Sequence, residues 1–254
     1  MKISSHALSC KSSEKSVLYR VRYFRCFDSI FQQQNLQFEK GYGISMGSKK
    51  GCFIVFEGID GSGKSTQISL LQEHIQEHSI NCMTTMEPSN GPIGTLLRQF
   101  LSGRIKGEET TLTALFAADR LDHLNNPVNG ICKLLDDGIA VLSDRYVFSN
   151  YAYQSVSVPL EWIMKCNEMA NEIVRPDCHI FIDVSPETAM ERVTKGRHQT
   201  DIYETKERLT DVRERYLDLI HRMEDVENII IVDGNRSPQE ISDDIWAKVC
   251  HYFV

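Results

Sequence analysis

Short apolar runs alternate along this chain with longer stretches in which apolar positions recur at helical spacing. Five runs are brief and continuous, and the first two end at Gly58 and Pro88. Such runs are typical of strands buried on both faces of a parallel sheet. The predicted strands are "CFIVFEG" (52–58), "NCMTTMEP" (81–88), "IAVLSD" (139–144), "CHIFIDV" (178–184) and "NIIIVDG" (228–234).

The stretches between the strands predict helices. Ile68, Leu71 and Ile75 would share one face of a helix over 64–78. Other helices are predicted over 92–103, 110–124, 127–137 and 159–174, from 186, over 207–223, and after the fifth strand. Because each strand is followed by a helix, we expect an α/β fold of three layers, in which helices cover both faces of a five-stranded parallel sheet.

The first 45 residues differ from the rest in charge and pattern. They carry seven Lys or Arg and three Asp or Glu, whereas the whole chain has a net charge of −7. Three interpretations stay open: a disordered tail, a basic and Ser-rich transit peptide, or an extension outside the mature protein. The last is favoured because Met46 stands where a compact domain would start. We expect one folded domain over residues 46–254.

The composition argues against several classes of protein. A net charge of −7 disfavours a general nucleic-acid binder, which would carry a basic surface. No run of 18 or more apolar residues predicts a membrane span. The eight cysteines include no C-x-x-C pair, which favours free thiols in a reducing compartment over disulfides or a zinc site. We expect a cytoplasmic protein, or one of mitochondria or another organelle if residues 1–45 are a transit peptide.

The segment "GIDGSGKS" (58–65) fits G-x-x-x-x-G-K-[ST] between a predicted strand and a predicted helix, as in a phosphate-binding P-loop. Its glycines let backbone N–H groups turn toward an oxyanion, and the helix N-terminus adds positive potential. Lys64 would neutralise the β- and γ-phosphates, and the Ser65 hydroxyl would ligate Mg²⁺. The expected donor-binding residues are Gly58, Asp60, Gly61, Ser62, Gly63, Lys64, Ser65 and Thr66. Since no N-K-x-D motif follows, a GTPase is disfavoured.

Asp144 and Arg145 stand at the end of the third predicted strand. Ligands of parallel α/β sheets bind beyond the carboxyl ends of the strands. Asp144 could therefore hold Mg²⁺ and Arg145 a phosphate, although such a pair is also common as a structural ion pair. The segment "SNYAYQ" (149–154) follows directly and offers hydroxyls, amides and rings to a sugar or base.

Two further features allow either a purely structural or a functional interpretation. Phe116 and Arg120 lie one helical turn apart. A lone Phe at this spacing usually belongs to the core, but the following Arg favours a ring that stacks on a base whose edge the Arg binds. The basic stretch "RVTKGRHQTDIYE" (192–204) is either a solvated loop or a lid over about 195–204 that brings Arg197 onto the transferred phosphoryl group. The P-loop favours the lid.

Together these motifs resemble those of the thymidylate kinase family of P-loop nucleoside-monophosphate kinases, from about residue 52 to the C-terminus. The resemblance rests on "FEGIDGSGKST", "EP…PIG", "LFAADRLDH", "LSDRYVFSNYAYQ", "RPDCHIFIDVSPETAMER" and the "GR…YE" lid. It implies transfer of the γ-phosphoryl group of Mg-ATP to dTMP, with dTDP and ADP as products, and a homodimer. Gly61 stands where some members carry an arginine, so the resemblance implies the lid-arginine type.

The resemblance also assigns roles to residues. The implied catalytic residues are Lys64, Arg145, Arg197 and Asp60, with Ser65 and Asp144 at the metal and Arg192 on the donor adenine. The implied dTMP-binding residues are Asp60, Glu87, Pro88, Arg98, Phe116, Arg120, Arg145, Ser149, Asn150, Tyr153, Gln154 and Tyr203. A Tyr153 ring under C2′ would explain a preference for deoxynucleotides. Two departures, Met86 and Ile202 in place of basic residues, leave open whether Arg98 or Arg145 holds the acceptor phosphate and which lid cation is catalytic.

Two alternatives stay open. A kinase of the same fold could act on another nucleotide or on a deoxynucleoside, and a deoxynucleoside kinase would need a carboxylate base, for which only Glu57 is a candidate. A non-catalytic ATP-binding module is less favoured, because the lid motif is intact.

Overall fold

A five-stranded sheet forms the centre of the computed structural model, which describes residues 51–196 and 205–253. The strands are β1 (Phe53–Glu57), β2 (Cys82–Met86), β3 (Ala140–Asp144), β4 (Cys178–Asp183) and β5 (Ile229–Asp233). All run parallel, in the order β2-β3-β1-β4-β5. The predicted parallel sheet is thus confirmed, and its middle strand β1 is buried along its whole length.

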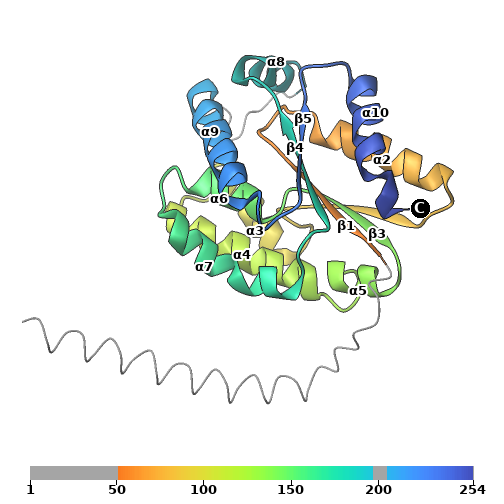
Figure 1. Ribbon diagram of the computed structural model, residues 1–254. Coiled ribbons are helices and arrows are strands. Elements are labelled where there is room, and N and C mark those ends of the chain that lie inside the picture. Colours follow the sequence, from red (N-terminus) through yellow and green to blue (C-terminus); the bar gives the residue numbers. More distant parts are fainter. Residues whose placement is uncertain (1–50, 197–204, 254) are drawn as a thin grey trace, which may run out of the picture. The chain divides into compact units, whose positions relative to one another are not determined.

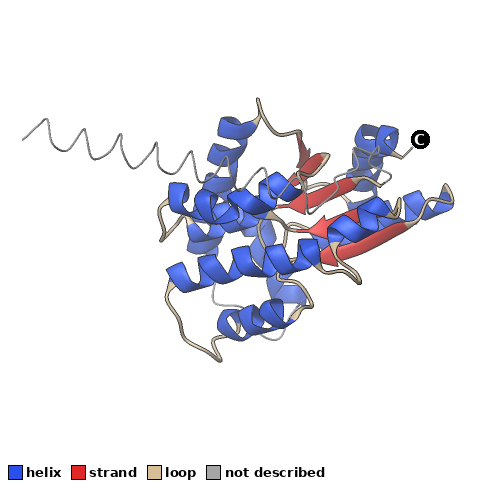
Figure 2. Ribbon diagram, turned by 90° about the horizontal axis from the view of Figure 1, so that it is seen from below, coloured by secondary structure: helices blue, strands red, loops and turns tan. Residues whose placement is uncertain are grey.

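Helices cover both faces of the sheet (Figure 1). On one face lie α2 (Lys64–Glu77) and α10 (Pro238–Val249). The opposite face carries α3 (Pro92–Leu101), α4 (Glu109–Asn125), α6 (Val147–Gln154), α7 (Leu160–Ile173) and α9 (Lys206–Met223). The remaining elements are α5 (Ile131–Asp136), α8 (Pro186–Gly196) and the 3₁₀ turn η1 (Cys250–Tyr252). Figure 2 shows the strands as a single layer among these helices, which confirms the predicted three layers.

One helix escapes prediction and another is shorter than expected. All eight residues of α6 are buried, so its sequence has no polar face that would reveal helical periodicity. The helix predicted over 127–137 begins only at Ile131. Before it, the Asn126 side chain accepts a hydrogen bond from the Val128 amide at 2.9 Å, which closes a turn.

The sheet brings the sequence motifs together. Since β1, β3 and β4 are neighbours and parallel, the loops that follow them open at the same edge. These loops include the P-loop after β1 and the Asp144–Arg145 turn after β3. Among the described residues, no helix is both long and apolar enough to cross a membrane.

Candidate active site

The P-loop joins β1 to α2, as the motif requires. Gly61 and Gly63 have φ angles of 80° and 97°, in the left-handed region that favours glycine. A Cβ atom at Gly61 would stand 2.3 Å from the carbonyl oxygen of Ala189, so a side chain there would clash with α8. Gly63 is the N-cap of α2 and has no side chain to satisfy the first amides of the helix. These N–H groups are thus available to an anion.

Lys64 folds back over this loop. Its Nζ donates hydrogen bonds to the carbonyl oxygens of Gly58 and Ile59, both at 3.1 Å. Burial and the charge of Arg145 lower the pKa of Lys64 to about 8, although neighbouring carboxylates oppose the shift. A cation that is this poorly compensated would be stabilised by an incoming phosphate.

Ser65 and Asp144 meet beside Lys64 and fit a magnesium ion. The Ser65 hydroxyl donates to Asp144 Oδ2 at 3.0 Å, while the buried Asp144 Oδ1 has no hydrogen-bond partner in the described structure. A buried carboxylate oxygen without a donor suits a cation. Within residues 51–196 and 205–253 no cluster of three His, Cys, Asp or Glu could hold a metal unaided. Mg²⁺ is usually held by one or two protein oxygens together with nucleotide phosphates, and Ser65 and Asp144 offer two such oxygens.

Arg145 directly follows β3 in an unusual backbone conformation. Its φ is 78°, a left-handed conformation that costs a non-glycine residue about 1–2 kcal/mol. The guanidinium donates to Asp60 Oδ1 at 2.6 Å, to Ser149 Oγ at 2.9 Å and to the Tyr153 hydroxyl at 3.1 Å. It also lies over the Tyr153 ring, with Cζ 4.8 Å from the ring centroid. Strain of this kind is concentrated at functional positions.

Asp60 is the carboxylate partner of this arginine. Tyr153 donates to its Oδ2 at 2.8 Å. Burial alone would raise the pKa of Asp60, but the charges of Arg145 and Lys64, together with the hydrogen bonds, lower it to about 2. Asp60 is therefore ionised at neutral pH. Together, Asp60 and Lys64 of the P-loop and Arg145 form one charged unit.

Two pockets adjoin at this unit. The first is lined by Asp60, Glu87, Pro88, Leu101, Phe116, Arg120, Arg145, Tyr146, Ser149, Asn150, Tyr153 and Gln154. The second is lined by Asp60, Gly61, Ser62, Gly63, Lys64, Ser65, Thr66, Gln67, Met86, Glu87, Asp144, Arg145, Arg192, Val193, Arg236, Pro238 and Ile241. Both lists contain Asp60, Glu87 and Arg145, so a group bound in one pocket lies next to a group bound in the other.

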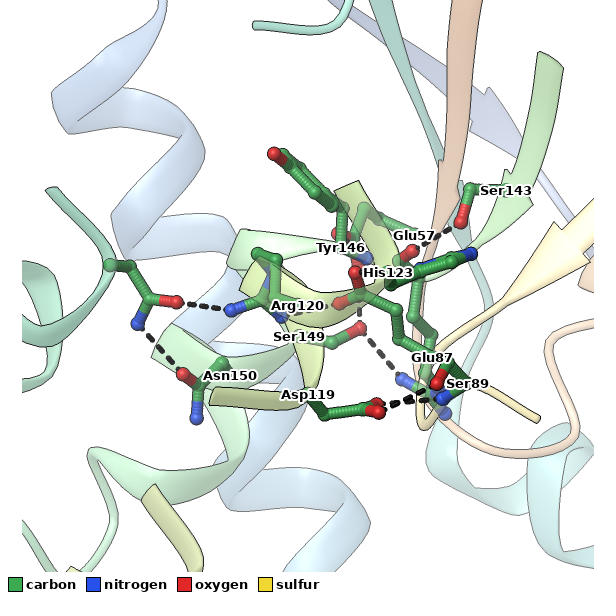
Figure 3. Close-up of polar contacts among 12 residues, drawn as sticks. Glu57, Glu87, Ser89, Asp119, Arg120, His123, Ser143, Tyr146, Ser149 and Asn150 are labelled. Carbon is green, nitrogen blue, oxygen red and sulfur yellow. Dashed lines mark hydrogen bonds and ion pairs between the residues drawn. The ribbon is translucent and has the colours of Figure 1, made fainter. Parts of the chain in front are cut away.

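The first pocket has a polar wall, in which Arg120 is central (Figure 3). Arg120 is buried and donates to Glu87 Oε2 at 2.6 Å on one side and to Asn167 on the other. Asn167 in turn donates to Asn150 Oδ1 at 2.8 Å. This network fixes the guanidinium and amide groups before any ligand arrives.

Gln154 completes that wall. It accepts a hydrogen bond from Asn150 at 3.0 Å, while its own Nε2 is buried and has no partner within the described structure. An unpaired buried donor in a pocket wall suits a carbonyl oxygen of a ligand. Phe116 lies in the same pocket, half-buried, on the helix α4 that carries Arg120.

Not every expected residue lines one of these pockets. Arg98 donates hydrogen bonds to the carbonyl oxygens of Pro88 and Ser89, at 3.0 and 2.7 Å. It lines neither of the two pockets. It therefore buttresses the loop after β2. Arg192 lines the P-loop pocket, where it donates to the carbonyls of Ser62 and Gly234. Arg197 and Tyr203 lie outside the described residues, as does the predicted lid beyond Gly196, and so does the segment 1–45.

Sequence reasoning missed several residues of the site. Asn167 and Tyr216 have no motif that marks them, because their roles depend on helices brought together by the fold. Tyr146 lies within the motif "LSDRYVFSNYAYQ", but no role was expected for it. Glu57 did carry a signal, a charged residue that ends an otherwise apolar strand. It is fully buried and lines neither of the two pockets. Glu57 is therefore badly placed to act as the base that a deoxynucleoside kinase would need.

Comparison with known proteins gives one consistent family. The thymidylate kinase family model matches residues 56–245. A thymidylate kinase of Symbiobacterium thermophilum is 36% identical over 201 residues, which cover 78% of this chain and 92% of that protein. A probable thymidylate kinase of Methanococcus aeolicus is 37% identical over 201 residues, with 78% and 95% coverage. A probable thymidylate kinase of Methanocaldococcus jannaschii is 38% identical over 198 residues, with 76% and 93% coverage. The chain therefore belongs to the thymidylate kinase family.

Proposed function

We propose that the chain is a dTMP kinase, which transfers the γ-phosphoryl group of ATP to the 5′-phosphate of dTMP and yields dTDP and ADP. Family membership and the names of its relatives support this activity. The observation that carries the proposal is the pair of adjoining pockets, one built on the P-loop and the other on a buried wall of Arg120, Asn150 and Gln154.

The donor occupies the P-loop pocket in this proposal. Backbone N–H groups of the loop and the first turn of α2 bind its phosphates, and Lys64 neutralises the charge between the β- and γ-phosphates. Arg192 lies on the adenine side. Ser65 and Asp144 would hold Mg²⁺, which when bound would neutralise charge on the phosphate oxygens. The fit of Asp144 supports this, since its Oδ1 is otherwise unpaired among the described residues.

The acceptor occupies the first pocket. The thymine ring stacks on Phe116, its edge meets Arg120, Asn150 and Gln154, and its phosphate meets Arg145. Glu87 holds Arg120, and Ser149 holds Arg145, so both act on the substrate through an arginine. The Tyr153 ring packs under the sugar, beside Asp60, where a 2′-hydroxyl has little room.

Catalysis then depends on position and charge. The acceptor is already an anionic phosphate oxygen, so the reaction needs no general base. Arg145 borders both pockets and is placed to neutralise the charge that spreads over the transferred group. The chain's own contribution is therefore to hold two anions in line and exclude water between them.

We further propose a cytoplasmic homodimer. The outer face of α7 exposes Trp162 and Met169, two turns apart, with 41% and 49% of their surfaces accessible. Large apolar side chains on one helix face are typical of a surface that contacts a second copy.

An acceptor panel tests the activity. ADP release by the full chain would be measured with ATP, Mg²⁺ and dTMP, dUMP, dCMP, UMP or AMP. We expect a strong preference for dTMP. Turnover with another nucleotide would overturn the assignment of the base wall, and ATP binding without turnover on any acceptor would favour a non-catalytic module.

A further inference from the structure

The wall between the two pockets has a buried carboxylate behind it. Glu57 ends the central strand β1 and has no exposed surface. It lines neither pocket itself, and the reaction proposed above gives it no part. A buried carboxylate needs compensation, since burial penalises its charged form.

The partners of Glu57 all belong to the surroundings of Arg145. Its Oε1 accepts a hydrogen bond from the backbone amide of Tyr146 at 3.0 Å. Its Oε2 accepts from the Ser149 hydroxyl at 2.5 Å and from the Tyr216 hydroxyl at 2.9 Å. These residues come from the turn after β3, from α6 and from α9, so one carboxylate joins three elements.

The same two hydroxyls also contact the arginine. Arg145 Nη1 donates to Ser149 Oγ at 2.9 Å and to the Tyr216 hydroxyl at 3.4 Å. A guanidinium can only donate and an ionised carboxylate can only accept, whereas a hydroxyl does both. Each hydroxyl can therefore link Arg145 to Glu57, and the two hydroxyls also lie within hydrogen-bond distance of each other, at 2.6 Å.

Glu57 also stabilises the strained backbone of Arg145. The left-handed φ of 78° turns the chain sharply after β3. The amide of Arg145 donates to the Phe56 carbonyl at 2.9 Å, and the next amide donates to Glu57 Oε1. Two successive residues of β1 thus fix the backbone and the side chain of the arginine.

We propose that Glu57 is a positioning residue for phosphoryl transfer, which holds the Arg145 guanidinium at the boundary of the two pockets through the hydroxyls of Ser149 and Tyr216. This inference rests on the proposed function, because it assigns Arg145 to the transferred phosphates. The raised pKa of Glu57, caused by burial and opposed by Ser149 and Arg145, agrees with a carboxylate that depends on these partners.

A neutral isostere tests the proposal. Glu57→Gln retains the volume and an acceptor for the Tyr146 amide but removes the charge. We expect kcat/KM for dTMP to fall about 10- to 100-fold, as for a weakened hydrogen bond to a charged group, with the ATP dissociation constant little changed. Tyr216→Phe should share part of the effect. Unchanged kinetics in Glu57→Gln would overturn the proposal.

A double-mutant cycle separates positioning from general stability. In an Arg145→Lys background, Glu57→Gln should cost little further activity, because the group it positions is already replaced. Equal losses in both backgrounds would assign Glu57 a structural role alone. The control is Glu227→Gln. Glu227 lies just before the start of β5, at the end of the sheet away from the P-loop, so this variant should leave the kinetics unchanged. If Glu57→Gln does not fold, Glu57→Asp enters the same cycle.

The proposed function is tested separately on the unaltered chain. If that chain prefers another nucleotide, the dTMP assignment fails, and the cycle is measured with the preferred acceptor. Coupling between Glu57 and Arg145 would then still support the positioning role.

Discussion

Buried ionisable residues determine the properties of the site at the scale of single residues. Burial and the nearby charge of Arg145 lower the pKa of Lys64 to about 8. The folded pKa lies below the unfolded value, so between about pH 8 and 10.5 the unfolded chain binds more protons. The burial of the Lys64 ammonium lowers the stability of the folded chain below about pH 8. This cost disappears, and the free energy of unfolding rises, as the pH increases through this window.

The same shift predicts proton uptake on ATP binding. At about pH 8.5 part of the unliganded protein carries neutral Lys64, and a bound triphosphate favours the ammonium form. Calorimetry in buffers of different ionisation enthalpy should detect this uptake at about pH 8.5 and almost none near pH 6.5. Lys64→Ala should lack it, and equal uptake in that variant would assign the proton to another group.

Removal of Lys64 also tests the P-loop directly. Lys64→Ala should reduce kcat at least about 100-fold, because no other group replaces its charge on the phosphates. Steady-state ADP release with dTMP measures this. Near-normal turnover would contradict the role of Lys64 in neutralising the phosphates.

Phe116 should act on one substrate only. Phe116→Ala is expected to raise KM for dTMP about 10-fold, the order of a lost base–aromatic stack, with KM for ATP unchanged. Leu115→Ala, one position along the same helix but outside both pocket linings, is the matched control. An equal rise in both KM values would mean that Phe116 has a structural role in the core and does not stack on the base.

The sequence predicts which residues form the site better than it predicts the hydrogen bonds among them. The P-loop, Asp144, Arg145 and Phe116 are visible as motifs. Asp144, Arg145, Phe116 and P-loop residues 60–65 line at least one of the two pockets, whereas Gly58 lines neither. The hydrogen bonds of Asn167 and Tyr216 could not be predicted, because they depend on where α7 and α9 lie on the sheet. The contacts of Arg98 are local, with the carbonyl oxygens of Pro88 and Ser89, but they depend on how the loop after β2 turns back onto α3.

At the scale of elements, periodicity predicts helices only where one side meets water. The face of α2 formed by Ile68, Leu71 and Ile75 is buried as expected. The helix α6 is buried all round between its neighbours, so nothing in its pattern distinguishes it from a loop. Strand order is a further property that local pattern does not contain.

Local sequence does specify the start of α10. The Ser237 hydroxyl and the Glu240 side chain form a reciprocal capping box. Ser237→Ala should lower the free energy of unfolding by about 1 kcal/mol in urea denaturation. Glu240→Gln should change it less, since glutamine also completes the box. A neutral Ser237→Ala variant would mean that packing alone holds this end.

For the whole molecule, the proposed dimer gives a measurable mass. Light scattering should report two chains per particle, and Trp162→Glu should shift the protein toward one chain, because it places a charge in the apolar contact. Val128→Glu alters a more exposed apolar residue away from α7 and is the control. A monomeric unaltered chain would contradict the dimer.

The central position of β1 also has a consequence for synthesis on the ribosome. Phe53 donates its amide to Asp177, 124 residues further along the chain, and both neighbours of β1 are made after it. The strand that begins the P-loop therefore stays unpaired, with its apolar residues exposed, until β3 and β4 have emerged. Contacts of such long sequence separation slow folding and leave strand edges open to aggregation. The strand that precedes the P-loop is thus translated before both of its partners and completes its native pairing only after β4 has emerged.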